Sequence, residues 1–326
     1  MLKYSVIGTS WITEMFINAA KKSKEAELLS IYSRREESAR AFAAKNGAVK
    51  GYTNLDEMLA DDSDFIYIAS PNNLHFEHVM KCIDHHKHVF CEKPMAFTEF
   101  QVQEIYRAAN EKNVFVFEGY RHLYSPNYRK LQASLKEVGK IRSVLFPYLQ
   151  YSSRYDQFKD GSIPNVFSKD FAGGVLMDLG VYPLSMTIDL FGNPNDLDYI
   201  PLLLPNGVDG NGTLVLRYDE FTVTILISKI TDSKLTAEIQ GEDGVLTINH
   251  IAPITNMTLT TRKQKEVTEL AGPQEELDMV YEIQAFSEMV KTNDRASFEK
   301  WMMRSAQVAK CLEKARHQNN ILFPGE

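Results

Sequence analysis

The chain has 326 residues, of which 44% are hydrophobic and 24% charged, and this composition and length suit a globular protein of two domains. The formal net charge of −7 argues against a nucleic-acid partner, because phosphate neutralisation needs clustered Lys and Arg. No apolar run approaches the ~20 residues of a membrane span, and the N-terminal apolar run is only strand-length, so no membrane association or signal peptide is expected. The cysteines, Cys82, Cys91 and Cys311, lack metal-ligand spacing, so we expect no metal site and a cytoplasmic protein with reduced thiols.

The first third of the chain alternates apolar strands with amphipathic helices. Strands are predicted at Leu2–Ile7, Glu27–Tyr32, Phe65–Ala69, His88–Cys91 and Val114–Glu118, with helices between them. Strands that alternate with helices of this length predict a doubly wound parallel sheet, the Rossmann type of α/β domain. We expect this domain to cover residues 1–119.

The turn after the first strand has the spacing of a dinucleotide-binding fingerprint. It reads Gly8-Thr9-Ser10-Trp11-Ile12-Thr13, so the first glycine is present while Ser10 and Thr13 occupy the other two glycine places. The N–H groups at the start of the next helix still offer a site for a pyrophosphate. The candidate cofactor contacts here are Gly8, Ser10, Trp11 and Ile12. A strand–turn–helix without a ligand explains the motif equally well.

The end of the second strand carries Ser33 and Arg34. A ribose 2′-hydroxyl is usually bound here by Asp or Glu, and a 2′-phosphate by arginine, so the sequence favours NADP over NAD. The alternative is that Arg34 only caps or solvates the following helix.

Two further strand ends carry polar residues that would reach the same edge of the sheet. Glu92, Lys93 and Pro94 follow one strand, and proline keeps its predecessor out of the helical region, so Lys93 has a fixed posture where open α/β folds bind ligands. Glu92 and Lys93 are therefore candidate cofactor contacts, and the other strand end supplies four more: Ser70, Pro71, Asn72 and His75. An ordinary turn with a solvated lysine remains the alternative for Lys93.

After residue 119 the pattern changes to a run of strands framed by helices. Helices are predicted at Ser125–Val138, Val175–Phe191, Pro273–Thr292 and Phe298–His317, a loop-rich stretch at Tyr151–Phe171, and strands at Lys140–Leu149, Thr213–Tyr218, Phe221–Ile227, Leu235–Gln240, Val245–Ile248 and Met257–Thr261. Hairpin-connected strands after a βαβ domain predict a second, α+β domain with a mainly antiparallel open sheet over residues 120–326.

Asp178 and Tyr182 are four residues apart on the helix predicted at Val175–Phe191, so they share one face of it. Gly173 and Gly174 precede them and permit close approach of a ligand or backbone. The alternative is a buried tyrosine with a satisfied hydroxyl and an early-helix carboxylate that complements the helix dipole.

The chain resembles the glucose–fructose oxidoreductase/inositol dehydrogenase family, often named with its MocA members. The matching residues, in order along the whole chain, are Gly8, Pro71-Asn72 with His75, Glu92-Lys93-Pro94, Gly173-Gly174 through Tyr182, and Gly241 to Gly244. The resemblance implies a Rossmann domain, a second domain whose open sheet often forms the contact of a homo-oligomer (dimer or tetramer), and NAD(P)-linked hydride transfer to or from a sugar, polyol or related small compound.

By the same resemblance Lys93, Asp178 and Tyr182 form the catalytic set, and the Lys93–Pro94 bond is often cis. Hydride transfer from a carbon bearing a hydroxyl needs an acid/base for the oxygen's proton. A free tyrosine has a pKa of about 10, and a nearby ammonium lowers it, so Lys93 would tune Tyr182 and polarise the substrate oxygen. Asp178 would orient the substrate hydroxyl or Lys93.

Two other functions compete with an NADP-preferring dehydrogenase. One is a non-catalytic cofactor-sensing protein, suggested by the degraded glycine turn; the other is a reductase of a larger conjugated ligand with Tyr151–Phe171 as a pocket wall. The presence of Lys93, Asp178 and Tyr182 together favours the dehydrogenase. Four residues are candidate substrate contacts by position: Tyr120, Arg121, Tyr155 and Asn165.

Overall fold

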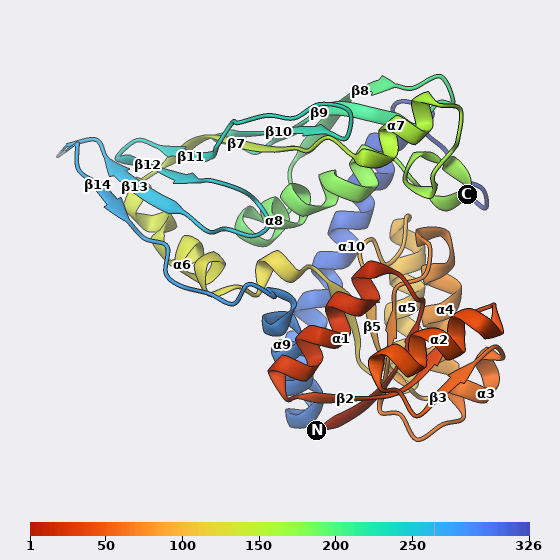
Figure 1. Ribbon diagram of the computed structural model, residues 1–326. Coiled ribbons are helices and arrows are strands. Elements are labelled where there is room, and N and C mark those ends of the chain that lie inside the picture. Colours follow the sequence, from red (N-terminus) through yellow and green to blue (C-terminus); the bar gives the residue numbers. More distant parts are fainter. Residues whose placement is uncertain (264) are drawn as a thin grey trace. The chain divides into compact units, whose positions relative to one another are not determined.

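The computed structural model describes residues 1–263 and 265–326, which form two compact units (Figure 1). The first unit contains Met1–Arg121 and Glu275–Ala306, and the second contains His122–Gln274 and Gln307–Glu326. The division expected from the sequence, after residue 119, assigned every later helix to the second domain. The structure instead places Glu275–Ala306 with the first unit.

The first unit is built on a six-stranded parallel sheet of order β3-β2-β1-β4-β5-β6, which confirms the predicted Rossmann type. The strands are β1 (Leu2–Ile7), β2 (Ala26–Tyr32), β3 (Lys50–Tyr52), β4 (Phe65–Ile68), β5 (His88–Glu92) and β6 (Val116–Gly119). The helices between them are α1 (Trp11–Ser23), α2 (Glu36–Asn46), α3 (Leu55–Leu59), α4 (His75–Asp84) and α5 (Glu99–Glu111). β3 was not expected, because three residues with a central Gly51 leave no apolar run to recognise.

Aromatic packing explains why α9 (Met279–Thr292) belongs to the first unit. Its Phe286 contacts the rings of Phe65, Phe90 and Phe117 on three neighbouring strands, with ring centroids 4.9, 5.4 and 5.7 Å apart. Burial of such large rings is a dominant favourable term in folding. The sequence pattern of α9 showed an apolar face but not the sheet on which that face packs.

The second unit is built on an eight-stranded sheet of order β14-β13-β12-β11-β7-β10-β9-β8, in which only β7 and β10 are parallel neighbours. This confirms the predicted mainly antiparallel sheet. The strands are β7 (Ile141–Leu149), β8 (Asp196–Leu203), β9 (Asp209–Arg217), β10 (Thr222–Ser228), β11 (Ala237–Gly241), β12 (Gly244–Ile248), β13 (Met257–Thr261) and β14 (Val267–Glu269). Figure 1 shows α6 (Pro126–Ser134) and α8 (Val181–Phe191) on the same face of this sheet.

Two segments of the second unit differ from the sequence expectation. The loop-rich stretch contains a short helix, α7 (Ser153–Lys159), and the helix expected at Val175–Phe191 is a π-helical segment, Leu176–Gly180, followed by α8. The stretch Lys169–Phe191 is long and apolar enough by length and composition to cross a membrane, but 89% of its apolar window is buried inside the protein. A buried core helix accounts for this stretch.

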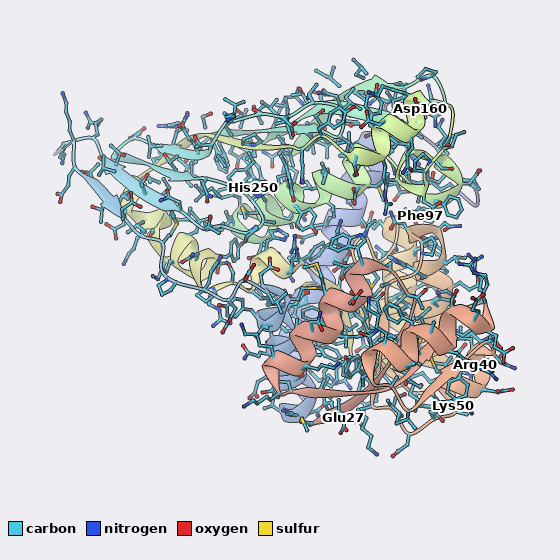
Figure 2. The ribbon with its side chains drawn as sticks, in the orientation of Figure 1. Glu27, Arg40, Lys50, Phe97, Asp160 and His250 are labelled. Atoms are coloured by element: carbon cyan, nitrogen blue, oxygen red, sulfur yellow. The ribbon has the colours of Figure 1, made fainter. Side chains whose placement is uncertain are left out.

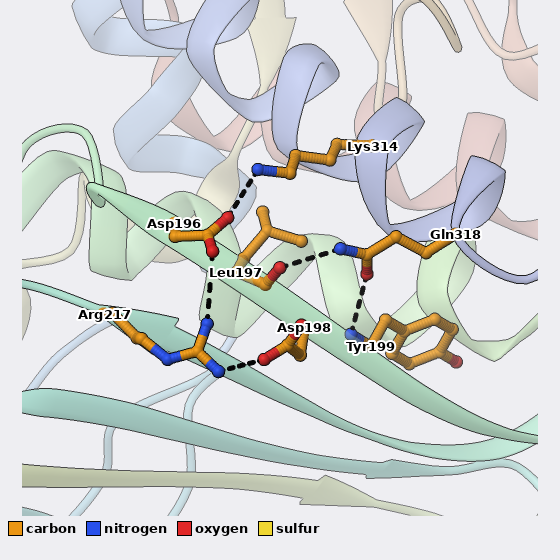
Figure 3. A network of polar contacts seen from close by, with 7 residues as sticks. All are labelled: Asp196, Leu197, Asp198, Tyr199, Arg217, Lys314 and Gln318. Atoms are coloured by element: carbon orange, nitrogen blue, oxygen red, sulfur yellow. Dashed lines mark hydrogen bonds and ion pairs between the residues drawn. The ribbon is translucent and has the colours of Figure 1, made fainter.

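The C-terminal part of α10 (Arg295–His317) is fastened to the edge strand β8 by the polar network in Figure 3. Lys314 Nζ lies 2.6 Å from Asp196 Oδ1, and Arg217 bridges Asp196 and Asp198. Just beyond the helix, Gln318 donates to the Leu197 carbonyl oxygen at 2.9 Å and accepts from the Tyr199 N–H at 3.1 Å. Exposed ion pairs contribute little each, so the two main-chain bonds of Gln318 set the register of this contact.

Candidate active site

The turn after β1 is shaped for close approach to the end of β4. Gly8 has φ +116°, and a Cβ there would lie 2.5 Å from the Ala69 carbonyl oxygen, so only glycine fits. Ser10 is the residue before α1, and its side chain caps no amide of that helix within the described residues. The first N–H groups of α1 are therefore available to an anion.

The two missing fingerprint glycines do not block this turn. Ser10 is exposed, and Thr13 is fully buried with its hydroxyl 3.4 Å from that of Ser10. Of the other predicted contacts, Trp11 is 62% exposed and Ile12 is partly buried. A narrow glycine turn, an uncapped helix start and small residues in both glycine places fit the pyrophosphate of a dinucleotide.

Arg34 is exposed just after β2, beside the loop that follows β4. In that loop Ser70 Oγ lies 2.9 Å from His78 Nδ1. Burial, together with the charges of Lys81 and Arg34, lowers the pKa of His78 to about 4. The predicted residues Ser70 and Arg34 thus share one edge of the sheet, and His78 is a neighbour that the sequence analysis missed.

His75, predicted to contact the cofactor, is 1% exposed and joins two loops. Its Nδ1 lies 2.8 Å from the Pro94 carbonyl oxygen and its Nε2 lies 2.7 Å from the Ser70 carbonyl oxygen. Burial lowers the pKa of His75 to about 4 although both carbonyls favour the imidazolium, so the ring is neutral at pH 7 and donates to one carbonyl at a time. This geometry ties the loop of Ser70, Pro71 and Asn72 to the turn of Lys93.

The turn after β5 holds Lys93 from both sides. The Lys93–Pro94 bond is cis, as the family resemblance implied. The next N–H, that of Met95, donates to Glu118 Oε1 at 2.8 Å, and Glu92 Oε1 accepts from the Tyr67 hydroxyl at 2.7 Å. Burial raises the pKa of the Glu92 carboxyl, while Tyr67 and the Lys93 ammonium act in the opposite direction. Lys93 is therefore a partly buried cation next to an acid.

In the second unit, Asp178 lies in the π-helical segment and forms an ion pair with Lys229. The Lys229 side chain is 7% exposed and that of Asp178 is 31% exposed. The sequence analysis did not name Lys229. The position of Lys229 directly after the buried strand β10 could have indicated a buried ion pair, since a lysine is rarely buried without an acidic partner.

Tyr182, at the start of α8, is 8% exposed and packs among aromatic rings. The His122 ring lies edge-on to it at 5.1 Å and the Tyr148 ring at 5.5 Å between centroids. His250, labelled in Figure 2, packs edge-on against Tyr148 at 4.7 Å. His122 Nε2 also lies 3.0 Å from the Tyr182 carbonyl oxygen. The tyrosine ring is held between two polar aromatic side chains.

A buried acid supports the segment that carries Asp178 and Tyr182. Asp209 is 1% exposed and accepts hydrogen bonds from the Leu176 N–H at 2.9 Å and the Tyr199 hydroxyl at 2.6 Å. A Cβ at Gly174, where φ is +123°, would lie 2.0 Å from Asp209 Oδ1. Gly174 therefore makes room for Asp209, which was not among the residues predicted from the sequence.

The four predicted substrate contacts fall in two places. In the first unit Tyr120 is 1% exposed and Arg121 forms an ion pair with Asp278 at 2.9 Å. In the second unit Tyr155 lies in a cluster of rings with Tyr151, Phe158 and Phe167. Asn165 is exposed in a 3₁₀ turn. Within the described residues no group of three or more His, Cys, Asp or Glu is arranged to hold a metal ion.

Comparison with known families gives two consecutive matches. Residues 2–120 match an oxidoreductase family with an NAD-binding Rossmann fold, and residues 129–247 match the GFO/IDH/MocA C-terminal domain. The chain belongs to the GFO/IDH/MocA oxidoreductase family. The resemblance seen in the sequence is confirmed, and with it the assignment as an NAD(P)-dependent oxidoreductase with a nicotinamide dinucleotide as cofactor.

Similar proteins cover the whole chain. It is 38% identical to a scyllo-inositol 2-dehydrogenase (NADP(+)) of Bacillus subtilis, over 100% of this chain and 99% of that protein. It is 28% identical to D-xylose 1-dehydrogenase (NADP(+)) 2 of Haloferax volcanii, over 90% of each. A crystal structure of a 3-ketoreductase from Actinomadura kijaniata with NADP and TDP-benzene has the same fold, with a TM-score of 0.83, 22% identity and 97% coverage of both chains.

Proposed function

We propose that this protein is an NADP-preferring dehydrogenase that transfers hydride between the nicotinamide and a hydroxyl-bearing carbon of a sugar or polyol, such as an inositol. The observation that carries the proposal is the end-to-end 38% identity to an NADP-dependent scyllo-inositol 2-dehydrogenase. The family assignment disfavours the non-catalytic alternative. We further propose a homo-oligomer formed through the eight-stranded sheet, and a cytoplasmic location.

The preference for NADP rests on Arg34 and its surroundings. The guanidinium is exposed at the end of β2, and no acid replaces it at the position that would bind a ribose 2′-hydroxyl. When bound, the dinucleotide supplies the hydride acceptor or donor. Gly8 and the start of α1 would hold its pyrophosphate, and Ser33 and Arg34 its adenosine ribose phosphate.

Proton transfer is assigned to Lys93 and Tyr182. A tyrosine exchanges a proton readily at neutral pH only when a cation stabilises its phenolate, and the Lys93 ammonium would supply that charge and polarise the substrate oxygen. Asp178, charge-balanced by Lys229, would accept a hydrogen bond from a substrate hydroxyl and so orient the sugar. A polyol, which offers several such hydroxyls, suits this donor and acceptor set.

The cofactor assignment is tested by titrating the protein with NADPH and NADH, using nicotinamide fluorescence or calorimetry. We expect tighter binding of NADPH, and a loss of about tenfold or more for NADPH alone in Arg34→Asp, since a bidentate phosphate contact is lost. Arg40→Asp is the matched control, because Arg40 is an exposed arginine on the next helix, paired with Glu36. Tighter binding of NADH than NADPH by the wild type would contradict the NADP preference.

A further inference from the structure

A buried carboxylic acid with no assigned role lies beside the turn of Lys93. Glu282, on α9, is 0% exposed. Among the described residues no N–H or O–H group donates a hydrogen bond to either oxygen of its carboxyl group. An isolated buried carboxylate is strongly unfavourable, and a carboxyl group in such a place takes up a proton instead. The side chain is therefore held as a neutral acid at a cost in stability.

This carboxyl group lies against Gly119, the residue that is paired with Glu92 in the sheet. Glu92 on β5 and Gly119 on β6 are paired neighbours, so their Cβ directions lie on the same face. A Cβ built at Gly119 would lie 3.6 Å from Glu282 Oε2. The absent side chain of Gly119 thus leaves the space in which Glu282 reaches toward the end of β5.

The packing of α9 holds Glu282 in that position. Phe286, one turn further along the helix, contacts Phe90, and Phe90 and Glu92 are two residues apart on the same face of β5. The groups whose charges act on Glu282 are Glu92, Asp278 and Arg121. Burial raises the pKa of Glu282 well above its usual value, the carboxylates of Glu92 and Asp278 add to the increase, and Arg121 opposes it.

We propose that Glu282 is a positioning residue for the reaction: as a neutral acid it shares one proton with Glu92, so that a single negative charge, rather than two, lies behind Lys93. The shared proton stabilises the Glu92 carboxylate, which already accepts from the Tyr67 hydroxyl and interacts with the ammonium of Lys93. Glu282 acts on the reaction through Glu92 and Lys93 and needs no contact with the substrate. This inference rests on the proposed role of Lys93.

Two substitutions separate this role from a structural one. Glu282→Met has similar length without polar atoms, and removes the proton that Glu92 shares. We expect its kcat to fall about tenfold, with the KM for NADPH unchanged, and the basic limb of its pH–rate profile to move to lower pH, since a less stable Glu92 carboxylate holds the Lys93 ammonium less well. Glu282→Gln, whose amide can donate to Glu92, should recover most of the lost activity. Equal kcat and pH profiles for Glu282→Met and the wild type would overturn the proposal.

A measurement without turnover tests the neutral acid itself. If Glu282 is protonated when folded and ionised when unfolded, the melting temperature of the wild type falls relative to that of Glu282→Gln as the pH rises from about 5 to about 8. Glu288→Gln is the control, because Glu288 is exposed on the same helix. The melting temperature of this variant, plotted against pH, should run parallel to that of the wild type. If the melting temperatures of Glu282→Gln and the wild type change in parallel with pH, Glu282 is an ordinary ionised acid. That result would refute the proposal, whatever the outcome for the proposed activity.

Discussion

Lys229 donates to the carboxylate of Asp178 from the end of β10, across 51 positions of sequence, and so provides the acid of the candidate catalytic set with a buried cation. The pair explains how a carboxylate can stay charged in a segment of buried residues. Asp178 is therefore one half of an ion pair and not an isolated acid on its helical segment.

Replacing Lys229 by Met should impair the reaction more than the fold. A charge-assisted hydrogen bond to a partly buried carboxylate contributes about 1.5–3 kcal/mol, so we expect kcat/KM to fall about tenfold or more while NADPH binding is retained. Steady-state kinetics and a cofactor titration measure the two effects. Lys234→Met, at an exposed lysine five positions later, is the control. Unchanged kinetics for Lys229→Met would show that Asp178 acts without it.

Gly174→Ala should strongly destabilise the second unit. The new Cβ would lie 2.0 Å from Asp209 Oδ1 at a residue with φ +123°. We therefore expect the loss of the hydrogen bond from the Leu176 N–H to Asp209 and of at least about 2 kcal/mol of unfolding free energy. Gly47→Ala provides the comparison, because Gly47 also has positive φ but a Cβ there would meet nothing within 4 Å. That variant should lose about 1 kcal/mol. If urea unfolding shows equal losses of unfolding free energy for Gly174→Ala and Gly47→Ala, Asp209 moves aside without a measurable loss of stability.

The first unit should lose stability as the pH falls from about 6.5 to about 4. Burial lowers the pKa values of His75, His78 and His88 to about 4, so these rings are neutral when folded and take up protons first in the unfolded chain. Stability is thus present above the unfolded pKa and is lost on acidification, by about 1.4 kcal/mol per pH unit for each ring. His75→Gln should reduce the slope of unfolding free energy against pH by the contribution of one ring. His86→Gln, at an exposed histidine, should leave that slope unchanged. Denaturant unfolding from pH 7 to pH 5 measures the slopes, and equal slopes for His75→Gln and the wild type would contradict the assignment.

Local patterns were sufficient for the fold and for the residues at strand ends. Alternating apolar runs located most strands of both sheets, though not β3, and the proline after Lys93 marked a constrained lysine at the edge of the first sheet. These signals need only neighbouring residues. Helix α9, by contrast, packs on a sheet formed some 160 to 220 residues earlier, so its place in the first unit required tertiary information.

The partners of the candidate site residues were not predictable in this way. Asp209 supports the Leu176 N–H from 33 positions away, and Arg121 meets Asp278 across 157 positions. Glu282 has no local feature that distinguishes it from Glu288, the exposed acid of α9. Such side chains acquire a role only when the sheet brings their neighbours together, and a single sequence carries no spacing that records it.

The proposed mechanism assigns proton transfer in an NADP-linked oxidation of a polyol or sugar to Lys93 and Tyr182. The most direct test is the formation of NADPH from NADP⁺ with a panel of inositols and aldoses, for the wild type, Lys93→Met and Tyr182→Phe. We expect turnover by the wild type and a loss of about 10²-fold or more in both variants, with unfolding unchanged in both and NADPH binding retained in Tyr182→Phe. Near-normal turnover in both variants would contradict it.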